Sequence, residues 1–372
     1  MSIQSNKRAS ELEKQLRVAK EGYYNLYPNI SDQEYDALRD ELKLICPDSK
    51  EISNIGAESP KISVWDKVKH QIPMGSLDKV NSIKEFEEWV DKIQNTSYLF
   101  THKIDGSSME LIYEEGKLIR CSTRGDGKIG EDVTENIIKV PNIPKKISSY
   151  EDTAIRGEIV MMKSIFFEKY SDKYANPRNT AAGKVRSKKD GGEGCKDLSF
   201  IAYTIISSQS KSKESDRFLE LSNIGFLIPE YSSGSSEEAK LWYENVSKSR
   251  ENIPYEIDGI VVRVEDIIKQ EGFGSHNMRP VGQKAWKFDP AMGVTTIIGV
   301  KWQVGTTGRI TPVAKVVPVS IGGVTISSIS LHNLSMFKKL ELRIGSKILV
   351  SRRNDVIPYI EKNLSKNDSD NI

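Results

Sequence analysis

The sequence of 372 residues is poor in the residues that build disulfide frameworks and metal centres. Its three cysteines, Cys46, Cys121 and Cys195, lie far apart and form no C-x-x-C pair, and its four histidines are isolated from one another. Disulfide frameworks and zinc sites both need such residues at close, regular spacings. We therefore expect neither a disulfide-stabilised fold nor a zinc site.

Long hydrophobic runs are also missing. No stretch approaches the roughly 20 apolar residues of a membrane-spanning helix, and the opening segment MSIQSNKRAS lacks the apolar core of a signal peptide. We expect a cytoplasmic protein that does not contact a membrane.

An excess of charge of one sign is absent too, since the net charge is only +2. The chain as a whole lacks the basic character of many nucleic-acid-binding domains. Residues 337–353 differ, because six basic side chains and one acidic one give that segment a net charge of +5. Such a run is usually a solvated face, but it is also suited to a phosphate backbone.

The first 45 residues have helical periodicity. Leu12, Leu16, Ala19 and Tyr23 recur at the spacing of one helix face. The segment SDQEYDALRDELKLI predicts a second helix, in which Ser31 and Glu34 form a capping box. Asp32, Tyr35 and Asp36 fall on one face of that helix, and the acids suit the positive end of its dipole.

The rest of the chain predicts a multidomain α+β protein. The segment MELIYEEGKLIRCS indicates a hairpin around Glu115-Gly116, and TAIRGEIVM, LSFIAYTII and IDGIVVRVE indicate strands among irregularly placed helices. After Pro290 short strands with glycine-rich turns predict a five-stranded barrel of the OB-fold type. The expected domains are a helical module at 1–58, an α+β domain at 59–289, a barrel at 290–364 and a disordered polar tail at 365–372.

The segment KIDG at 103–106 places a lysine after a strand, followed by an aspartate and a glycine. Lys103 is either a surface charge beside a turn or a nucleophile. A lysine nucleophile must lose its proton, although a free lysine has a pKa of about 10.4. The glycine permits a close approach of the backbone. The pattern alone is weak, because three fixed positions recur often by chance.

Further clusters follow along the chain. STRGDGKIGED (122–132) is a glycine-rich loop that can approach a phosphate or a ribose, and RGE (156–158) belongs to a strand. NPRNTAAGKVRSKK sets basic residues around a turn of small residues. Asp258 precedes a buried strand, and Lys287 lies between two aromatic residues. Each cluster alone has an ordinary structural explanation, whereas their joint occurrence in this order favours a nucleotide site.

The ordered set KIDG, TRGDG, RGE, NPRN-x-AAG, IDGIVVRV and AWKF resembles the NAD-dependent DNA ligases, over nearly the whole chain. The N-terminal segment YYNLYPNISDQEYD resembles the NAD-recognition module of that family, and WQVGTTGRITPVAKVVPV, LHN and RRNDVIP resemble its OB-fold. The resemblance implies a nucleotidyltransferase (adenylation) domain at 59–289. It also implies a monomer that seals 5′-phosphate/3′-hydroxyl nicks in double-stranded DNA through a lysyl-AMP intermediate, releasing nicotinamide mononucleotide (NMN) and AMP.

The resemblance implies a role for each matching residue. Lys103 matches the nucleophile that takes adenylate from NAD⁺, and Asp105, Asp258 and Lys287 match further catalytic residues. Other matches are to nucleotide contacts (Ser76, Leu77, Arg124, Glu158, Tyr203, Arg263 and Lys287), to NMN contacts (Tyr23, Tyr24, Asp32, Tyr35 and Asp36), to DNA contacts (Arg124, Arg178 and Arg186, with Lys338, Lys339, Arg352 and Arg353 of the basic segment) and to ligands of Mg²⁺ or Mn²⁺ (Asp258 and Glu158).

The chain departs from the family pattern at several positions. Thr101 stands where the family has a glutamate that reads the adenine, Arg263 where it has a lysine, and Thr306 where it has an arginine. Asn354 replaces a glycine. The sequence also ends after the barrel, without the zinc finger, helix-hairpin-helix repeats and BRCT domain of the family. We expect a compact ligase of viral or phage type; a piece of a longer protein is the alternative.

Two other functions remain open. An ATP- or GTP-using nucleotidyltransferase, such as an RNA ligase or capping enzyme, shares K-x-D-G and the barrel but has no use for an NMN module. The second alternative is a nucleic-acid-binding protein whose nucleotidyltransferase domain is inactive. The presence of all four residues Lys103, Glu158, Asp258 and Lys287 disfavours it.

Overall fold

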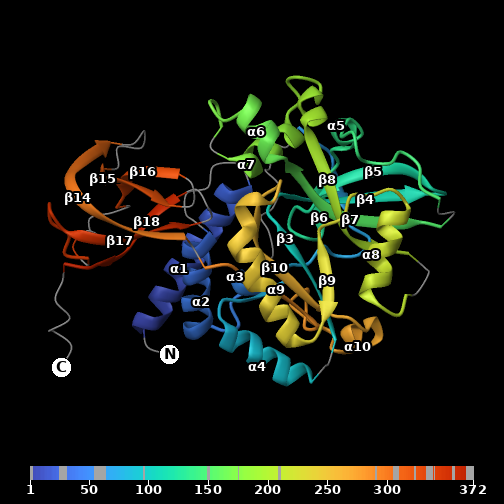
Figure 1. Ribbon diagram of the computed structural model, residues 1–372, viewed down its shortest axis with the longest axis horizontal. Coiled ribbons are helices and arrows are strands. Elements are labelled where there is room, and N and C mark those ends of the chain that lie inside the picture. Colours follow the sequence, from blue (N-terminus) through green and yellow to red (C-terminus); the bar gives the residue numbers. More distant parts are fainter. Residues whose placement is uncertain are drawn as a thin grey trace. The chain divides into compact units, whose positions relative to one another are not determined.

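The computed structural model describes residues 3–24, 32–53, 64–94, 97–148, 151–174, 176–207, 211–289, 291–304, 310–321, 324–331, 338, 340–353 and 357–365. The chain divides into two compact units (Figure 1). The first comprises Met1–Ile30 and Leu38–Phe288, and the second Ser31–Ala37 and Asp289–Ile372. The mixture of helices and strands in the first unit and a β-sheet in the second agrees with the predicted multidomain α+β class.

The N-terminal segment is helical, as its periodicity predicts. Its helices are α1 (Ile3–Tyr24), α2 (Asp32–Ile45) and α3 (Lys50–Ser53). Leu12 and Leu16 of α1 and Leu42 of α2 are fully buried, and Arg8 of α1 pairs with Glu41 of α2 at 2.7 Å. The side chain of Tyr23 and the predicted capping residues Ser31 and Glu34 lie outside what the structure describes.

A five-stranded sheet forms one half of the first unit, in the order β2-β13-β10-β3-β9. Only the β13–β2 pairing is parallel. The strands are β2 (Asp78–Val80), β13 (Gln283–Lys287), β10 (Ile257–Val264), β3 (Tyr98–Ile104) and β9 (Tyr231–Gly234).

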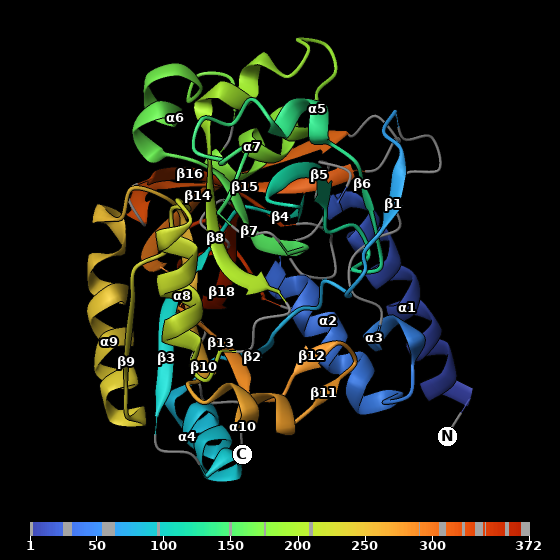
Figure 2. The ribbon, with the colours of Figure 1, turned by 90° about the vertical axis from the view of Figure 1, so that its right-hand side faces the viewer.

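Helices α4 (Ile83–Ile93) and α9 (Ser236–Ser249) pack on this sheet (Figure 2). Between them lies Trp286 of β13, which is 1% exposed. Its ring stacks on Phe86 of α4, with centroids 4.3 Å apart, and on Tyr243 of α9, at 4.2 Å. This aromatic stack joins both helices to the strand that carries Lys287.

An antiparallel four-stranded sheet, in the order β5-β4-β7-β8, forms the other half of the first unit. Its core includes Ile137, Phe166, Val185 and Leu221 from the neighbouring helices. The strands are β4 (Ser107–Glu114), β5 (Lys117–Thr123), β7 (Thr153–Met161) and β8 (Leu198–Ile206), and the helices are α5 (Thr134–Ile137), α6 (Lys163–Lys169), α7 (Pro177–Arg186) and α8 (Glu214–Asn223).

The predicted hairpin and strands are present in this sheet. Glu115 and Gly116 join β4 to β5 with φ angles of 48° and 75°. Two successive positive φ values belong to the type I′ turn, whose twist matches that of the strands. Strands β7 and β8 coincide with the predicted segments TAIRGEIVM and LSFIAYTII.

Smaller elements complete the first unit. Strand β1 (Lys67–Lys69) pairs with β6 (Ile129–Glu131), and β11 (Ser275–His276) with β12 (Arg279–Pro280). Further helical segments among the described residues of this unit are α10 (Ile267–Gly272), η1 (Glu193–Asp197) and η2 (Arg250–Asn252).

The second unit contains the predicted five-stranded OB-fold, in the order β16-β15-β14-β17-β18. The long strand β14 pairs with β17 through its first half and with β15 through its second, and β16 contacts β18. Ile297, Val316, Ile329, Ile348 and Val350 form much of its core. The strands are β14 (Ala291–Val304), β15 (Ile310–Ile321), β16 (Val324–Ser330), β17 (Lys347–Arg353) and β18 (Ile357–Asn363).

Three local predictions are wrong. The segment NPRNTAAGKVR forms helix α7, not a turn of small residues, because Asn176 accepts a hydrogen bond from the N–H of Asn179 and Pro177 occupies the first turn. Lys103 does not follow a strand but lies within β3, which continues to Ile104. Asp258 does not precede its strand but lies within β10, which begins at Ile257.

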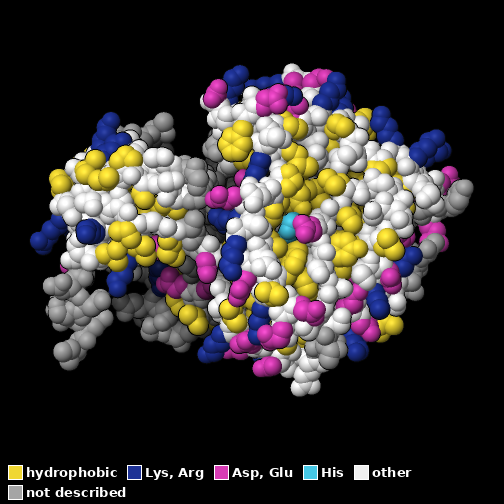
Figure 3. Space-filling model, viewed as in Figure 1, with side chains coloured by type: hydrophobic (Ala, Val, Ile, Leu, Met, Phe, Trp, Pro, Cys, Tyr) yellow, Lys and Arg dark blue, Asp and Glu magenta, His cyan; other side chains and the backbone are white. Residues whose placement is uncertain are grey.

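The described surface mixes both signs of charge. Lys and Arg side chains are interspersed with Asp and Glu over the face shown in Figure 3, which fits the small net charge of +2. Among the described helices, none has the length and apolar character needed to cross a membrane.

The stack around Trp286 yields a prediction about stability. We expect Trp286→Ala to lower the free energy of unfolding by about 3–5 kcal/mol, because a large buried ring leaves a cavity. Leu241→Ala, at a position of α9 that is 60% exposed, is the matched control and should change it by less than about 0.5 kcal/mol. Urea denaturation followed by tryptophan fluorescence and circular dichroism measures both, and equal effects of the two variants would contradict the packing described.

Candidate active site

Lys103 and Lys287 are brought together by the five-stranded sheet. Gly259 of the central strand β10 lies directly opposite Lys103 on β3 and opposite Lys287 on β13. Residues directly opposite on neighbouring strands point to the same face. Both lysine side chains therefore project from the same face of the sheet, on either side of Gly259, which has no side chain.

Gly259 is the only residue type that fits this position. A Cβ atom there would lie 2.2 Å from the carbonyl oxygen of Trp286 and 2.9 Å from the Cα of Lys287. Any side chain would push β13 away from β10 and carry Lys287 with it.

Asp258 lies between the two lysines. The pairing of β10 with β3 shifts register between Ile257 and Gly259, and such a β-bulge turns the side chain of its extra residue. Both oxygens of Asp258 accept hydrogen bonds from Lys103 Nζ, at 2.6 and 2.7 Å. Lys287 Nζ lies 3.8 Å from Asp258 Oδ2.

The charge state of Asp258 follows from this arrangement. Burial raises the pKa of its carboxyl, but the attraction of Lys103 and Lys287 and the hydrogen bonds from Lys103 outweigh burial, so the pKa lies below its ordinary value. The carboxylate is therefore a fixed negative charge that holds two ammonium groups in place.

The four-stranded sheet supplies the other wall of the site. The chain passes from β3 to β4 through Asp105 and Gly106, where a Cβ on Gly106 would lie 2.5 Å from the carbonyl oxygen of Ile159. The predicted close approach of the backbone at this glycine is therefore present. It brings the end of β3 against β7, the strand of Glu158.

Glu158 is a buried acid with an incomplete set of partners. Its Oε1 accepts hydrogen bonds from Ser108 Oγ at 2.6 Å and from Tyr203 OH at 3.3 Å. Its buried Oε2 has no hydrogen-bond partner among the described residues. Burial raises the pKa of Glu158 to about 7, although Ser108 and the charges of Arg124 and Lys103 act in the opposite direction.

The predicted basic residues of helix α7 are held by acids. Arg178 Nη1 pairs with Asp105 Oδ1 at 2.6 Å, so it contacts the turn that follows Lys103. Arg186 Nε pairs with Glu131 Oε2 at 3.0 Å, and Trp65 Nε1 donates to the carbonyl oxygen of Arg186 at 3.0 Å.

Two more predicted contacts lie in well-defined surroundings. Ser76 and Leu77 are half-buried just before β2. Arg263 is 5% exposed; its Nη1 donates to the carbonyl oxygen of Tyr203 at 3.2 Å and its guanidinium lies over the Phe218 ring. Four residues along β10 from Gly259, it is roughly 13 Å from the lysine pair, and the structure does not bring it into that cluster.

The departing residue Thr101 is buried in β3, with 1% exposure, and its hydroxyl donates to the carbonyl oxygen of His102 at 3.3 Å. Tyr35 is half-buried in α2, and Lys338 is exposed. The other predicted positions lie outside the residues or side chains that the structure describes: Tyr23, Tyr24, Asp32, Asp36, Thr306, Lys339, Arg352, Arg353 and Asn354.

The two acids of the site, Asp258 and Glu158, suit a Mg²⁺ ion that is shared with a substrate. Among the described residues no group of three or more His, Cys, Asp or Glu side chains could enclose a metal ion. Mg²⁺, however, is commonly bound by one or two carboxylates together with water and the phosphates of a substrate. Asp258 and Glu158 offer the hard oxygen ligands for such a shared site.

Sequence reasoning missed three polar residues next to the site, the buried His70 and Glu110 and the half-buried Arg156. Glu110 joins the other two, at 2.8 Å from His70 Nδ1 and 2.8 Å from Arg156 Nη2. The alternation of β4 and β7 could have placed Glu110 and Arg156 on one sheet face, but no local pattern ties His70 to either.

Comparison with known proteins gives matches over both units. The family model for the NAD-dependent DNA ligase adenylation domain matches residues 62–291, and the model for the NAD-dependent DNA ligase OB-fold domain matches residues 294–371.

Curated proteins named DNA ligase match over most of the chain. One from Sorangium cellulosum is 35% identical over 96% of this chain and 56% of its own length. Those from Acinetobacter baumannii strain AYE and Treponema denticola are each 36% identical, over 90% and 95% of this chain and 54% and 57% of their own lengths. The chain spans about half the length of the curated relatives it matches.

The raised pKa of Glu158 yields a prediction about stability and pH. The folded protein keeps the Glu158 proton up to about pH 7, whereas an unfolded glutamate loses it near pH 4.5. Since the folded state binds more protons between these values, the free energy of unfolding should fall as pH rises from 5 to 8, by up to about 3 kcal/mol. Urea denaturation of Glu158→Gln should show a correspondingly smaller fall, whereas the exposed Glu114→Gln should behave as the wild type. An equal fall in Glu158→Gln and wild type would disprove the raised pKa.

Proposed function

The chain belongs to the family of NAD-dependent DNA ligases, and from that premise we propose that it seals nicks in double-stranded DNA with NAD⁺ as the source of adenylate. The observation that supports this most directly is the arrangement of Lys103 and Lys287 around Asp258 and Gly259, facing the incompletely paired Glu158.

We propose that Lys103 is the nucleophile. The Lys103 ammonium first loses one proton to solvent. The neutral amine then forms a bond to the α-phosphorus of NAD⁺, the bond from that phosphorus to its bridging oxygen breaks, NMN leaves with the electron pair of that bond, and the nitrogen releases its second proton to solvent. Asp258 fixes the direction of Nζ through its hydrogen bonds of 2.6 and 2.7 Å. Lys287 brings a positive charge to the phosphate. Transfer reactions at phosphorus depend mainly on positioning and charge neutralisation.

The later steps transfer the adenylate and close the backbone. AMP passes from Lys103 to the 5′-phosphate at the nick, and the 3′-hydroxyl then attacks that phosphate and expels AMP. Arg124, Arg178 and Arg186 are proposed to bind DNA here, with Lys338, Lys339, Arg352 and Arg353 of the second unit. The ion pairs of Arg178 and Arg186 with Asp105 and Glu131 must loosen for those arginines to contact phosphates.

The nucleoside part of NAD⁺ is assigned to the four-stranded sheet. Glu158 Oε2, a buried acceptor without a hydrogen-bond partner among the described residues, suits a ribose hydroxyl, because an unpaired buried polar atom is costly. Tyr203, Arg263, Ser76 and Leu77 are proposed as the neighbouring adenosine contacts. Mg²⁺, held by Asp258 and Glu158 with the phosphates, would supply further charge neutralisation when bound.

The N-terminal helices are proposed to recognise the NMN half through Tyr23, Tyr24, Asp32, Tyr35 and Asp36. Aromatic rings and carboxylates suit a cationic nicotinamide ring and a ribose. The domain limits 1–58, 59–289, 290–364 and 365–372, the monomeric state and the cytoplasmic location stay predictions.

Incubation with NAD⁺ labelled in its adenylate phosphate tests the nucleophile. The wild type should become covalently labelled from NAD⁺ but not from labelled ATP, and nicked DNA should discharge the label. Lys103→Ala should remain unlabelled because it lacks the attacking amine. Lys92→Ala, which replaces an exposed lysine of α4, is the matched control and should label normally. Label from ATP would instead indicate an ATP-using nucleotidyltransferase, and no label from either substrate would indicate an inactive binding protein.

Substitution in α2 tests the NMN module. Tyr35→Ala and Asp36→Ala should abolish labelling by NAD⁺, because the leaving half of the substrate loses its contacts. Both variants should still seal nicked DNA that is already adenylated, since that step contains no NMN. Gel assays of labelling and of sealing measure the two activities separately, and a parallel loss of both would refute the assigned role.

A further inference from the structure

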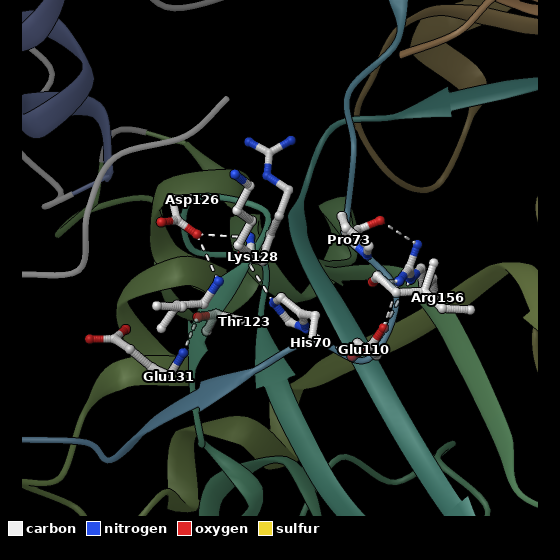
Figure 4. A network of polar contacts seen from close by, with 11 residues as sticks. His70, Pro73, Glu110, Thr123, Asp126, Lys128, Glu131 and Arg156 are labelled. Carbon is white, nitrogen blue, oxygen red and sulfur yellow. Dashed lines mark hydrogen bonds and ion pairs between the residues drawn. The ribbon is translucent and has the colours of Figure 1, made fainter. Parts of the chain in front are cut away.

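Glu110 of β4 is a buried acid that touches neither lysine of the site. It is 1% exposed, and both of its oxygens are used (Figure 4). Oε2 lies 2.8 Å from His70 Nδ1, and Oε1 accepts from Arg156 Nε at 3.0 Å and Nη2 at 2.8 Å. Burial raises the pKa of Glu110, but His70 and Arg156 lower it below its ordinary value, so the group is a buried carboxylate between an imidazole and a guanidinium.

This carboxylate lies one step from the proposed ribose contact on the same sheet face. Glu110 on β4 is directly opposite Arg156 on β7, just as Ser108 on β4 is directly opposite Glu158 on β7. Residues two apart along a strand point to the same face. The Glu110–Arg156 pair is therefore the cross-strand pair next to Ser108–Glu158 on this face of the sheet.

His70 links Glu110 to the loop of Arg124. Its Nε2 lies 3.1 Å from the carbonyl oxygen of Arg124. A carboxylate and a carbonyl oxygen only accept hydrogen bonds, so the ring makes both bonds when both of its nitrogens bear protons. In that form His70 transmits the position of Glu110 to the backbone of Arg124.

Arg156 links Glu110 to the segment that leads to Ser76. Its Nη1 donates to the carbonyl oxygen of Pro73 at 3.1 Å, and its Nη2 donates to that of Ile72. One planar guanidinium thus bonds a carboxylate and two successive carbonyl oxygens, a geometry that lysine does not reproduce.

The two linked segments also bond to each other. The N–H of His70 donates to the carbonyl oxygen of Lys128 at 2.9 Å, and the N–H of Met74 to that of Gly127 at 2.7 Å. A Cβ on Gly130 would lie 1.8 Å from the carbonyl oxygen of Thr123 and 3.0 Å from His70 Nε2. Residues 70–77 and 124–130 therefore lie side by side and are joined by hydrogen bonds. Glu110 anchors both segments to the sheet through His70 and Arg156.

We propose that Glu110, His70 and Arg156 form a positioning unit for NAD⁺, which holds Arg124 and the Ser76–Leu77 segment ready beside Glu158. None of the three touches the reacting atoms. This inference rests on the proposed function, since it concerns the same nucleotide site. Without the unit, both segments would spend less time in the arrangement that binds NAD⁺, and the apparent affinity would fall in proportion to that fraction. Bound NAD⁺ would restore the arrangement, so the saturated rate would change little.

Glu110→Gln tests the unit, with Glu114→Gln as matched control, because Glu114 is an exposed glutamate of the same strand. The rate of lysyl-adenylate formation is measured against NAD⁺ concentration in single turnovers. We expect the half-saturating NAD⁺ concentration to rise about tenfold in Glu110→Gln, with the saturated rate within about threefold of wild type, and no change in Glu114→Gln. A lower saturated rate at an unchanged half-saturating concentration would overturn the proposal.

Hydrogen exchange measured by mass spectrometry separates this proposal from the proposed function. In protein without NAD⁺, peptides covering 68–77 and 123–131 should exchange faster in Glu110→Gln than in wild type, and peptides of β10 should not. Unchanged exchange in both segments would overturn the positioning unit even if the wild type is a ligase. Absence of labelling by NAD⁺ in the wild type would instead overturn the proposed function and leave the exchange result valid as a test of the contacts.

Arg156→Lys is the second variant, needed if Glu110→Gln does not fold. It keeps a positive charge beside Glu110 but loses the fork that bonds Pro73 and Ile72. We expect a smaller rise in the half-saturating NAD⁺ concentration, about threefold, with faster exchange mainly in 68–77, because the His70 link to Arg124 is intact. Equal loosening of 123–131, or none in 68–77, would contradict the separate links described.

Discussion

Two lysines that leave the same sheet face repel each other unless an anion lies between them. Asp258 is that anion, with Lys103 at 2.6 and 2.7 Å and Lys287 at 3.8 Å. Its side chain reaches them because a bulge in β10 turns it out of the regular pairing. The rest of the first unit can be understood as support for this contact, from the Trp286 stack behind β13 to the Gly106 turn after β3.

The two acids of the site lie in opposite environments. Asp258 faces two lysines, and its pKa lies below the ordinary value. Glu158 is buried and accepts hydrogen bonds from Ser108 and Tyr203, and burial raises its pKa to about 7. An acid that stays charged suits the orientation of ammonium groups and phosphates. An acid with an acceptor oxygen that lacks a hydrogen-bond partner among the described residues suits a neutral hydroxyl group. The different environments of Asp258 and Glu158 therefore suit different parts of one substrate.

The amino-acid sequence predicts elements where a short pattern determines them. The Glu115-Gly116 turn, strands β7 and β8 and the OB-fold follow from local periodicity and turn chemistry. The helix at Pro177 was missed because small residues and a glycine outweighed the capping signal of Asn176. Local patterns single out Lys103, Asp258 and Lys287, and the family resemblance gives them roles, but their convergence depends on Gly259 being central in the sheet, which is a matter of strand order. The contact of His70 with Glu110, 40 positions away, has no local signature at all.

Gly259 has a consequence for how the site withstands change elsewhere in the chain. Neighbouring strands in any β-sheet lie about 4.8 Å apart, so two residues that flank a central strand have their Cα atoms roughly 10 Å apart. That spacing is a property of backbone hydrogen bonding and does not depend on which side chains fill the core. The sheet therefore sets the distance between the Cα atoms of the two lysines. Substitutions in the surrounding helices can accumulate without altering that distance, so long as position 259 has no side chain.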